Sequence, residues 1–96
     1  MEIEQRIYNG DRAREVLENE AFIAAFADIR QELTDQWKQS PVRDIEGREK
    51  LYQLLKLTDK LEATLRTSLD TGKLAQLDLK HKQTLAERAK AALGLD

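Results

Sequence analysis

The 96-residue chain contains no cysteine and few residues that interrupt a helix. Without cysteine it has no disulfide framework and no thiolate to serve as nucleophile or metal ligand. One proline and four glycines leave few positions at which a helix has to end. The alternation of apolar and polar residues that is typical of strands is absent over any useful length. These absences predict an all-α protein.

Long apolar runs are missing as well. The longest uncharged run, Ala21–Ala27, has seven residues, whereas a membrane-spanning helix needs roughly 20. The first ten residues carry acids where a secretory signal has basic residues. With 41% hydrophobic and 35% charged residues, the chain has enough apolar side chains for one modest core. We therefore expect a single domain over residues 1–96, in the cytoplasm and without membrane contact.

Capping residues divide this domain into segments. Asp11, Asn19 and Asp44 each precede a helical pattern and have side chains suited to accept hydrogen bonds from the first free amides. Gly94 follows the last pattern and marks the end of its helix. The expected segments are a loose lead-in (1–10), a short helix (11–18) and three further helices (20–39, 44–70 and 73–93).

Proline then predicts how the two long helices meet. Pro41 disfavours helical geometry at Ser40, so the helix of residues 20–39 ends there, and a short turn makes the helix of residues 44–70 its antiparallel neighbour. Apolar residues follow one face of each. On the first they are Phe22, Phe26, Ile29, Leu33 and Trp37; on the second, a heptad seam, they are Leu51, Leu54, Thr58, Leu61, Leu65 and Ser68.

The segment after Gly72 leaves two architectures open. If the chain reverses at Gly72, the helix of residues 73–93 packs back onto the hairpin. The hairpin is then extended to a small three- to four-helix bundle with coiled-coil-like packing, which is the expected fold. If the chain continues, the last helix projects as an arm.

Residues with catalytic chemistry are sparse. His81 is the only histidine, and although Asp78 and Thr84 lie on the same side of its helix, a surface or seam position explains it better. A lone histidine without cysteine cannot build a zinc site of the usual kind. The Gly-Lys pair at Gly72 lacks the rest of a phosphate-binding loop. We expect no catalytic, cofactor-binding or metal-binding residues, and no enzyme.

Two surfaces are candidates for binding. Trp37 and Tyr52 bracket the hairpin tip, where they either pack across the hairpin or anchor a protein partner, and Leu57 is the leucine best placed for an exposed contact. The alternative partner is nucleic acid, although acidic residues interrupt the basic ones in the last helix and no aromatic residue follows Tyr52. The candidate phosphate contacts are Lys73, Lys80, Lys82, Arg88 and Lys90.

From about residue 13 to residue 77 the chain resembles small uncharacterised helical proteins of tailed bacteriophages, whose genes lie near the head and packaging genes. The shared features are an asparagine before an acid or proline and an "AF" pair, a tryptophan at the end of the first long helix, an "REKLY"-like start of the next helix and a "GKLA" break. They correspond to Asn19, Phe22, Trp37, Arg48, Glu49, Leu51, Tyr52, Gly72 and Lys73. These motifs are structural, so the resemblance transfers no site residues.

Together these features predict a non-enzymatic phage protein that acts through helix-mediated protein contacts in head assembly or DNA packaging. Phage head or packaging components, or further copies of the chain, are the expected partners. Two alternatives stay open: a nucleic-acid-binding packaging accessory similar to a small terminase, and an inhibitor of a host protein. The resemblance implies a location in the cytoplasm of the bacterial host or in the virion.

Overall fold

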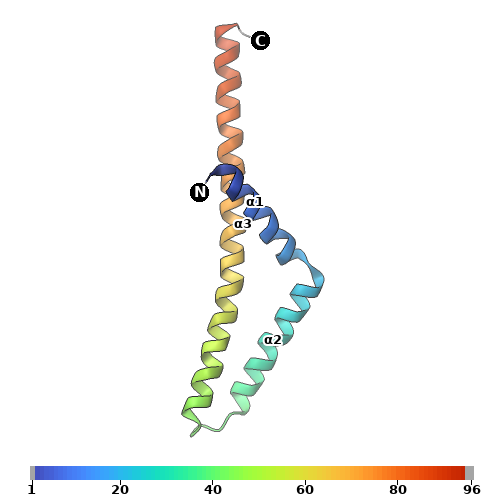
Figure 1. The fold of residues 1–96 in the computed structure, drawn as a ribbon, viewed down its shortest axis with the longest axis vertical. Coiled ribbons are helices and arrows are strands. Elements are labelled where there is room, and N and C mark those ends of the chain that lie inside the picture. Colours follow the sequence, from blue (N-terminus) through green and yellow to red (C-terminus); the bar gives the residue numbers. More distant parts are fainter. Residues whose placement is uncertain (1, 95–96) are drawn as a thin grey trace.

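The computed structural model describes residues 2–94, which form the helices α1 (Ile3–Glu18), α2 (Glu20–Gln39) and α3 (Ile45–Leu93) without any strand. Helix α3 is a long rod, α2 runs antiparallel beside its first part, and α1 crosses it further along (Figure 1). The all-α class and the antiparallel hairpin are confirmed. Residue 1 and residues 95–96 of the predicted domain lie outside the described residues.

Helix α2 has the bounds that the sequence predicts, because its capping groups are local. The side chain of Asn19 accepts a hydrogen bond from the backbone amide of Phe22 at 3.0 Å. Ser40 is extended, with φ −67° and ψ 139°, so α2 ends just before Pro41. The side chain of Asp44 caps α3 in the same way by accepting from the amide of Gly47 at 3.1 Å.

The predicted loose lead-in over residues 1–10 is wrong, since α1 begins at Ile3, and Asp11 does not cap it. Gly10 lies inside this helix and is buried against α3. A glycine inside a helix costs about 1 kcal/mol relative to alanine. Here that cost is offset, because the missing side chain lets the backbones of α1 and α3 approach each other.

The predicted break at Gly72 is also wrong, because α3 runs without interruption to Leu93 and no separate helix packs back from residue 73. A Cβ atom added to Gly72 would lie 2.8 Å from the Cα atom of Gly10 and 3.0 Å from the carbonyl oxygen of Arg6. Gly72 is therefore a close-approach residue. The third helix packed on the hairpin is α1 instead of the C-terminal segment.

The heptad seam of α3 continues past this crossing. After Ser68, the residues Gly72, Ala75 and Leu79 follow at steps of four, three and four. The first part of the seam is rich in leucine, whereas Gly72 and Ala75 of the second part are small and buried where α1 crosses α3 (Figure 1). Ala13 and Ala75, 4% and 2% exposed, are the buried hydrophobic residues of the described chain.

The molecule is elongated, with extents of 77 × 25 × 15 Å. Its radius of gyration is 21.7 Å, compared with about 12.5 Å for a compact domain of this length. Beyond Leu79, α3 extends past the N-terminal end of α1 (Figure 1). We call residues 80–93 the arm; every side chain in it is exposed except that of Thr84, which is half-buried.

Candidate protein-contact surfaces

Four apolar side chains gather at the tip of the hairpin, and we call them the tip patch: Trp37, Val42, Ile45 and Tyr52. They line one shallow depression of about 260 Å³, together with Arg48 and Glu49. Val42 is 86% exposed and Ile45 76%. Isolated apolar side chains are common on protein surfaces, but a contiguous exposed group at the end of a rod is typical of a binding surface.

Arg48 fixes the position of Trp37 within this patch. Its guanidinium lies over the indole, 4.5 Å from the ring centroid. The same group donates hydrogen bonds to the backbone carbonyl of Ser40 at 3.2 Å and to its hydroxyl at 3.0 Å. These acceptors lie at the C-terminal end of α2, where the helix dipole favours a cation. The indole of Trp37 therefore rests against Arg48 in the unbound chain.

The structure brings together two of the three predicted contact residues. Trp37 and Tyr52 share the tip patch. Leu57 is 62% exposed and lines a separate shallow hollow on α3 with Leu54. Val42 and Ile45 were not predicted, although their signal is visible in the sequence as two apolar residues within an otherwise charged turn.

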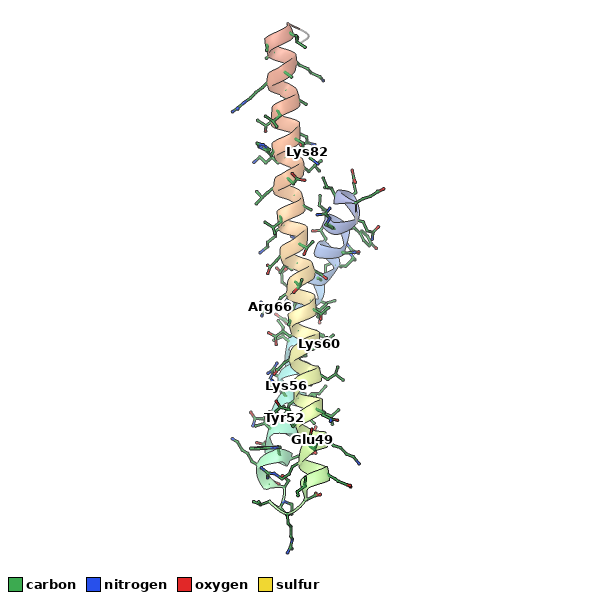
Figure 2. All side chains as sticks on the ribbon, turned by 90° about the vertical axis from the view of Figure 1, so that its left-hand side faces the viewer. Glu49, Tyr52, Lys56, Lys60, Arg66 and Lys82 are labelled. Atoms are coloured by element: carbon green, nitrogen blue, oxygen red, sulfur yellow. The ribbon has the colours of Figure 1, made fainter. Side chains whose placement is uncertain are left out.

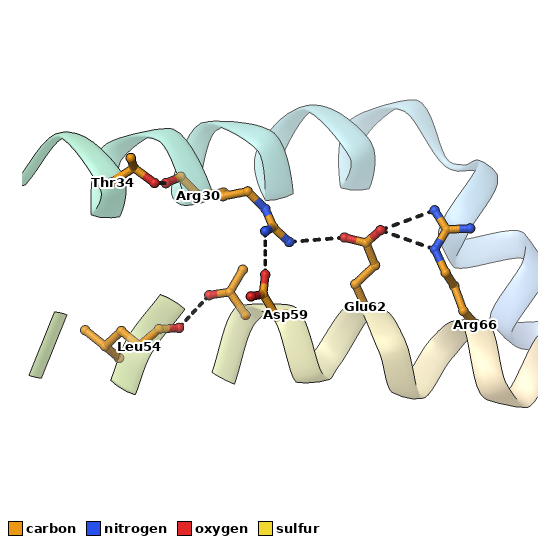
Figure 3. Close-up of polar contacts among 7 residues, drawn as sticks. Arg30, Thr34, Leu54, Asp59, Glu62 and Arg66 are labelled. Atoms are coloured by element: carbon orange, nitrogen blue, oxygen red, sulfur yellow. Dashed lines mark hydrogen bonds and ion pairs between the residues drawn. The ribbon is translucent and has the colours of Figure 1, made fainter. Parts of the chain in front are cut away.

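A charged network joins α2 to α3 away from the tip (Figure 3). Arg30 of α2 pairs with Asp59 and, at 3.2 Å, with Glu62 of α3. Arg66 pairs with the other oxygen of Glu62, also at 3.2 Å. All four side chains are at least one-third exposed, so each pair contributes little to stability and mainly sets the register of the hairpin. Sequence alone does not reveal pairs 29 and 32 residues apart.

A second hollow lies between α2 and α3 near the bend at Asn19, and we call it the groove. Its volume is about 460 Å³, and its apolar lining consists of Leu17, Phe22, Ile23, Phe26 and Ala27. The rings of Phe22 and Phe26 stack with their centroids 5.6 Å apart. Arg30, Glu62 and Arg66 line the same groove, and both arginines pair with Glu62, so the charged lining carries one net positive charge.

The candidate nucleic-acid contacts lie on and just before the arm, whose side chains project all around the helix; among the described helices none lies beside it (Figure 2). Lys82 pairs with Asp78 at 3.4 Å. Because successive residues are about 100° apart on a helix, Lys80 and Lys82 point to nearly opposite sides. The five basic residues, which also include Lys73, Arg88 and Lys90, therefore do not form one face.

Other kinds of site are not found in the described residues. No three histidine, cysteine, aspartate or glutamate side chains within residues 2–94 are grouped so that they could hold a metal ion. His81 is exposed. Across the same part of the chain, no helix combines the length and apolar character of a membrane span.

Comparisons with known proteins do not assign the chain to a family. No family model matches the chain, and neither the curated proteins nor the solved structures contain a significant match.

Proposed function

We propose that this chain is a non-enzymatic bacteriophage protein that binds other proteins through its helices during head assembly or DNA packaging. The large solvent-accessible surface of the chain supports this proposal. The accessible surface is 7713 Å², whereas a compact monomer of 11.1 kDa exposes about 5,700 Å². The excess of about 2,000 Å² exceeds the roughly 800 Å² that each partner buries in a standard interface.

The observation that carries the proposal is the tip patch. Binding energy at protein interfaces concentrates in a few aromatic and large apolar side chains that fit a pocket on the partner. Trp37 has this character and is already oriented by Arg48, which lowers the entropy lost on binding. Val42 and Ile45 extend the apolar area beside it. The phage setting rests on the sequence resemblance, which includes Trp37 and Tyr52.

A double variant of the tip tests this function. Val42→Glu with Ile45→Glu places two charges in the patch at exposed positions. We expect the tagged wild-type protein to retain head or packaging proteins from infected cells, and the tip variant to retain them at least roughly tenfold less, as expected for loss of hot-spot residues. Ala63→Glu with Thr64→Glu is the matched control, because it adds the same charge to exposed positions of α3.

Other outcomes of these experiments would contradict the proposed function or support one of the two alternative functions. The proposal fails if the wild-type protein retains no phage protein and is missing from virions and packaging complexes by mass spectrometry. Specific retention of one host protein would instead support the host inhibitor. A DNA mobility shift at low salt that disappears at higher salt would support the packaging accessory that binds nucleic acid.

A further inference from the structure

The groove changes from apolar to polar along its length. On α2 the apolar part lies near the bend at Asn19 and consists of Phe22, Ile23, Phe26 and Ala27. The polar part lies further toward the hairpin tip and consists of Arg30, Gln31 and Thr34. A ligand that matches both parts has an apolar chain at one end and a polar head at the other.

Two arginines share one carboxylate at the polar end (Figure 3). Arg30 reaches Glu62 from α2, and Arg66 reaches it from α3 through Nε and Nη2, each 3.2 Å from the same oxygen. Asp59 also pairs with Arg30 but does not line the groove. A guanidinium has five N–H donors, so the Nη1 side of Arg66 still has donors without a partner among the described residues. This side suits a carboxylate, which accepts two hydrogen bonds from a guanidinium.

The size of the groove favours a small ligand over a helix of another protein. Its volume of about 460 Å³ lies within the roughly 300–1,000 Å³ of small-molecule sites. One turn of an α-helix, about 10 Å wide and 5.4 Å long, already fills roughly 420 Å³. A helix that docks in a groove uses anchors about two turns apart. The groove is therefore too short to hold such a helix.

The length of the lining indicates the length of the ligand. From Phe22 to Arg30, α2 rises about 12 Å, and an extended chain advances roughly 3.5 Å per three bonds, so the carbon chain of decanoate spans about 11 Å. We propose that the groove binds a medium-chain carboxylate. Its alkyl chain lies against the stacked rings of Phe22 and Phe26, and its carboxylate accepts hydrogen bonds from Arg66. The groove shares no lining residue with the tip patch, so the inference goes beyond the proposed function.

Titration with decanoate, below the concentration at which it forms micelles, tests this site. We expect isothermal titration calorimetry to give one decanoate per chain, and the shifted amide resonances in NMR spectra to include those of Ile23 and Ala27. Octanoate is expected to bind roughly four- to fifteenfold more weakly, because each methylene removed from water contributes up to about fourfold. Decylamine has the same chain with the opposite charge, so we expect it to bind at least about tenfold more weakly.

Two variants separate the head of the ligand from its chain. Arg66→Gln removes the cation and is expected to weaken decanoate binding at least roughly threefold. Ala27→Phe adds bulk inside the groove from an exposed position, and is expected to weaken binding at least roughly fivefold. Adhesion of the alkyl chain to any apolar surface would instead be strengthened by the added ring. Circular dichroism of each variant verifies that its helix content is unchanged.

Lys82→Gln is the matched control for the head. Lys82 and Arg66 both lie on α3, their side chains are 61% and 63% exposed, and each pairs with an acidic residue four positions earlier. Lys82 does not line the groove, so its substitution is expected to leave decanoate affinity unchanged.

Four results would overturn the inference: no saturable binding of decanoate, equal affinity for decylamine, a folded Arg66→Gln variant with unchanged affinity, or tighter binding by Ala27→Phe. A helical peptide of leucine and glutamate that binds the groove when decanoate does not would assign it to a protein partner instead. The proposed function fails by a different measurement. A chain that binds decanoate but retains no phage protein defeats the proposed function alone.

Discussion

At the scale of single residues, the contact between Gly10 and Gly72 determines where α1 lies on α3. An added Cβ on either glycine would lie 2.8 Å from the Cα atom of the other. Backbone atoms cannot move aside as a flexible side chain can, so any larger residue has to separate the two helices. Ala13 and Ala75, the buried residues beside this crossing, are small for the same reason.

The substitution Gly72→Ala tests this contact, because a close contact and an open one predict changes of opposite sign in the free energy of unfolding. Overpacking a close contact costs about 1–3 kcal/mol, which exceeds the gain of about 1 kcal/mol from the better helix propensity of alanine. We expect a net loss of stability in urea unfolding followed by circular dichroism. If α1 did not pack closely here, the same substitution would stabilise the protein by about 1 kcal/mol.

At the scale of elements, α3 has two different neighbours along its length, and within residues 2–94 no helix packs on its C-terminal end. Helix α2 lies beside the first part of α3, and α1 crosses α3 at Gly72 (Figure 1). Gly94 ends the helix in a left-handed conformation, with φ 69°, and its amide donates a hydrogen bond to the carbonyl of Ala91 at 3.2 Å. The arm therefore belongs to a helix that contacts α2 near its start and α1 near its middle.

The continuity of α3 predicts a long distance between its ends. Spin labels on Lys50→Cys and Lys90→Cys would be unique, because the chain has no cysteine of its own. A rise of 1.5 Å per residue places them about 60 Å apart by pulsed electron paramagnetic resonance, with unlabelled protein in excess to suppress contacts between copies. A distance less than about half of this would mean that the helix folds back. Lys50→Cys with Lys60→Cys is the control, at about 15 Å.

At the scale of the whole molecule, the surface is large and the interior is small. Tyr52, Leu54, Leu57, Leu61, Leu74 and Leu77 of α3 are all between 47% and 67% exposed. An isolated chain leaves these side chains in water, whereas an assembly that covered them would remove their apolar surface from water. Stability and association are therefore expected to be coupled.

This coupling predicts a melting temperature that depends on protein concentration. Raising the concentration to a hundredfold above the dissociation constant of the assembly adds about 2.7 kcal/mol to the folded state. For a chain of this length we expect Tm to rise by roughly 10–20 °C. A wild-type Tm that stays constant would contradict the coupling.

The sequence by itself determined the helical class, the bounds of α2, the start of α3 at its Asp44 cap and its end at Gly94. These features depend on local interactions. The Asn19 side chain, for example, accepts a hydrogen bond from the amide of Phe22, three residues further along the chain. The sequence also indicated Trp37 and Tyr52 as neighbours at the tip, since Pro41 makes the two helices antiparallel. Val42 in the turn and Ile45 at the start of α3 are apolar residues among charged ones, but only the packed hairpin shows that they share a patch with Trp37 and Tyr52.

Only the tertiary structure decided the roles of Gly10 and Gly72. Each glycine read alone indicates a helix end, because its local effect is to weaken a helix. Their actual role depends on a contact between residues 62 positions apart. The pairing of Arg30 with Glu62 and the groove beside Phe26 likewise depend on the register of the packed helices. Local rules specify where helices form, whereas the docking of one helix on another requires the packed backbone.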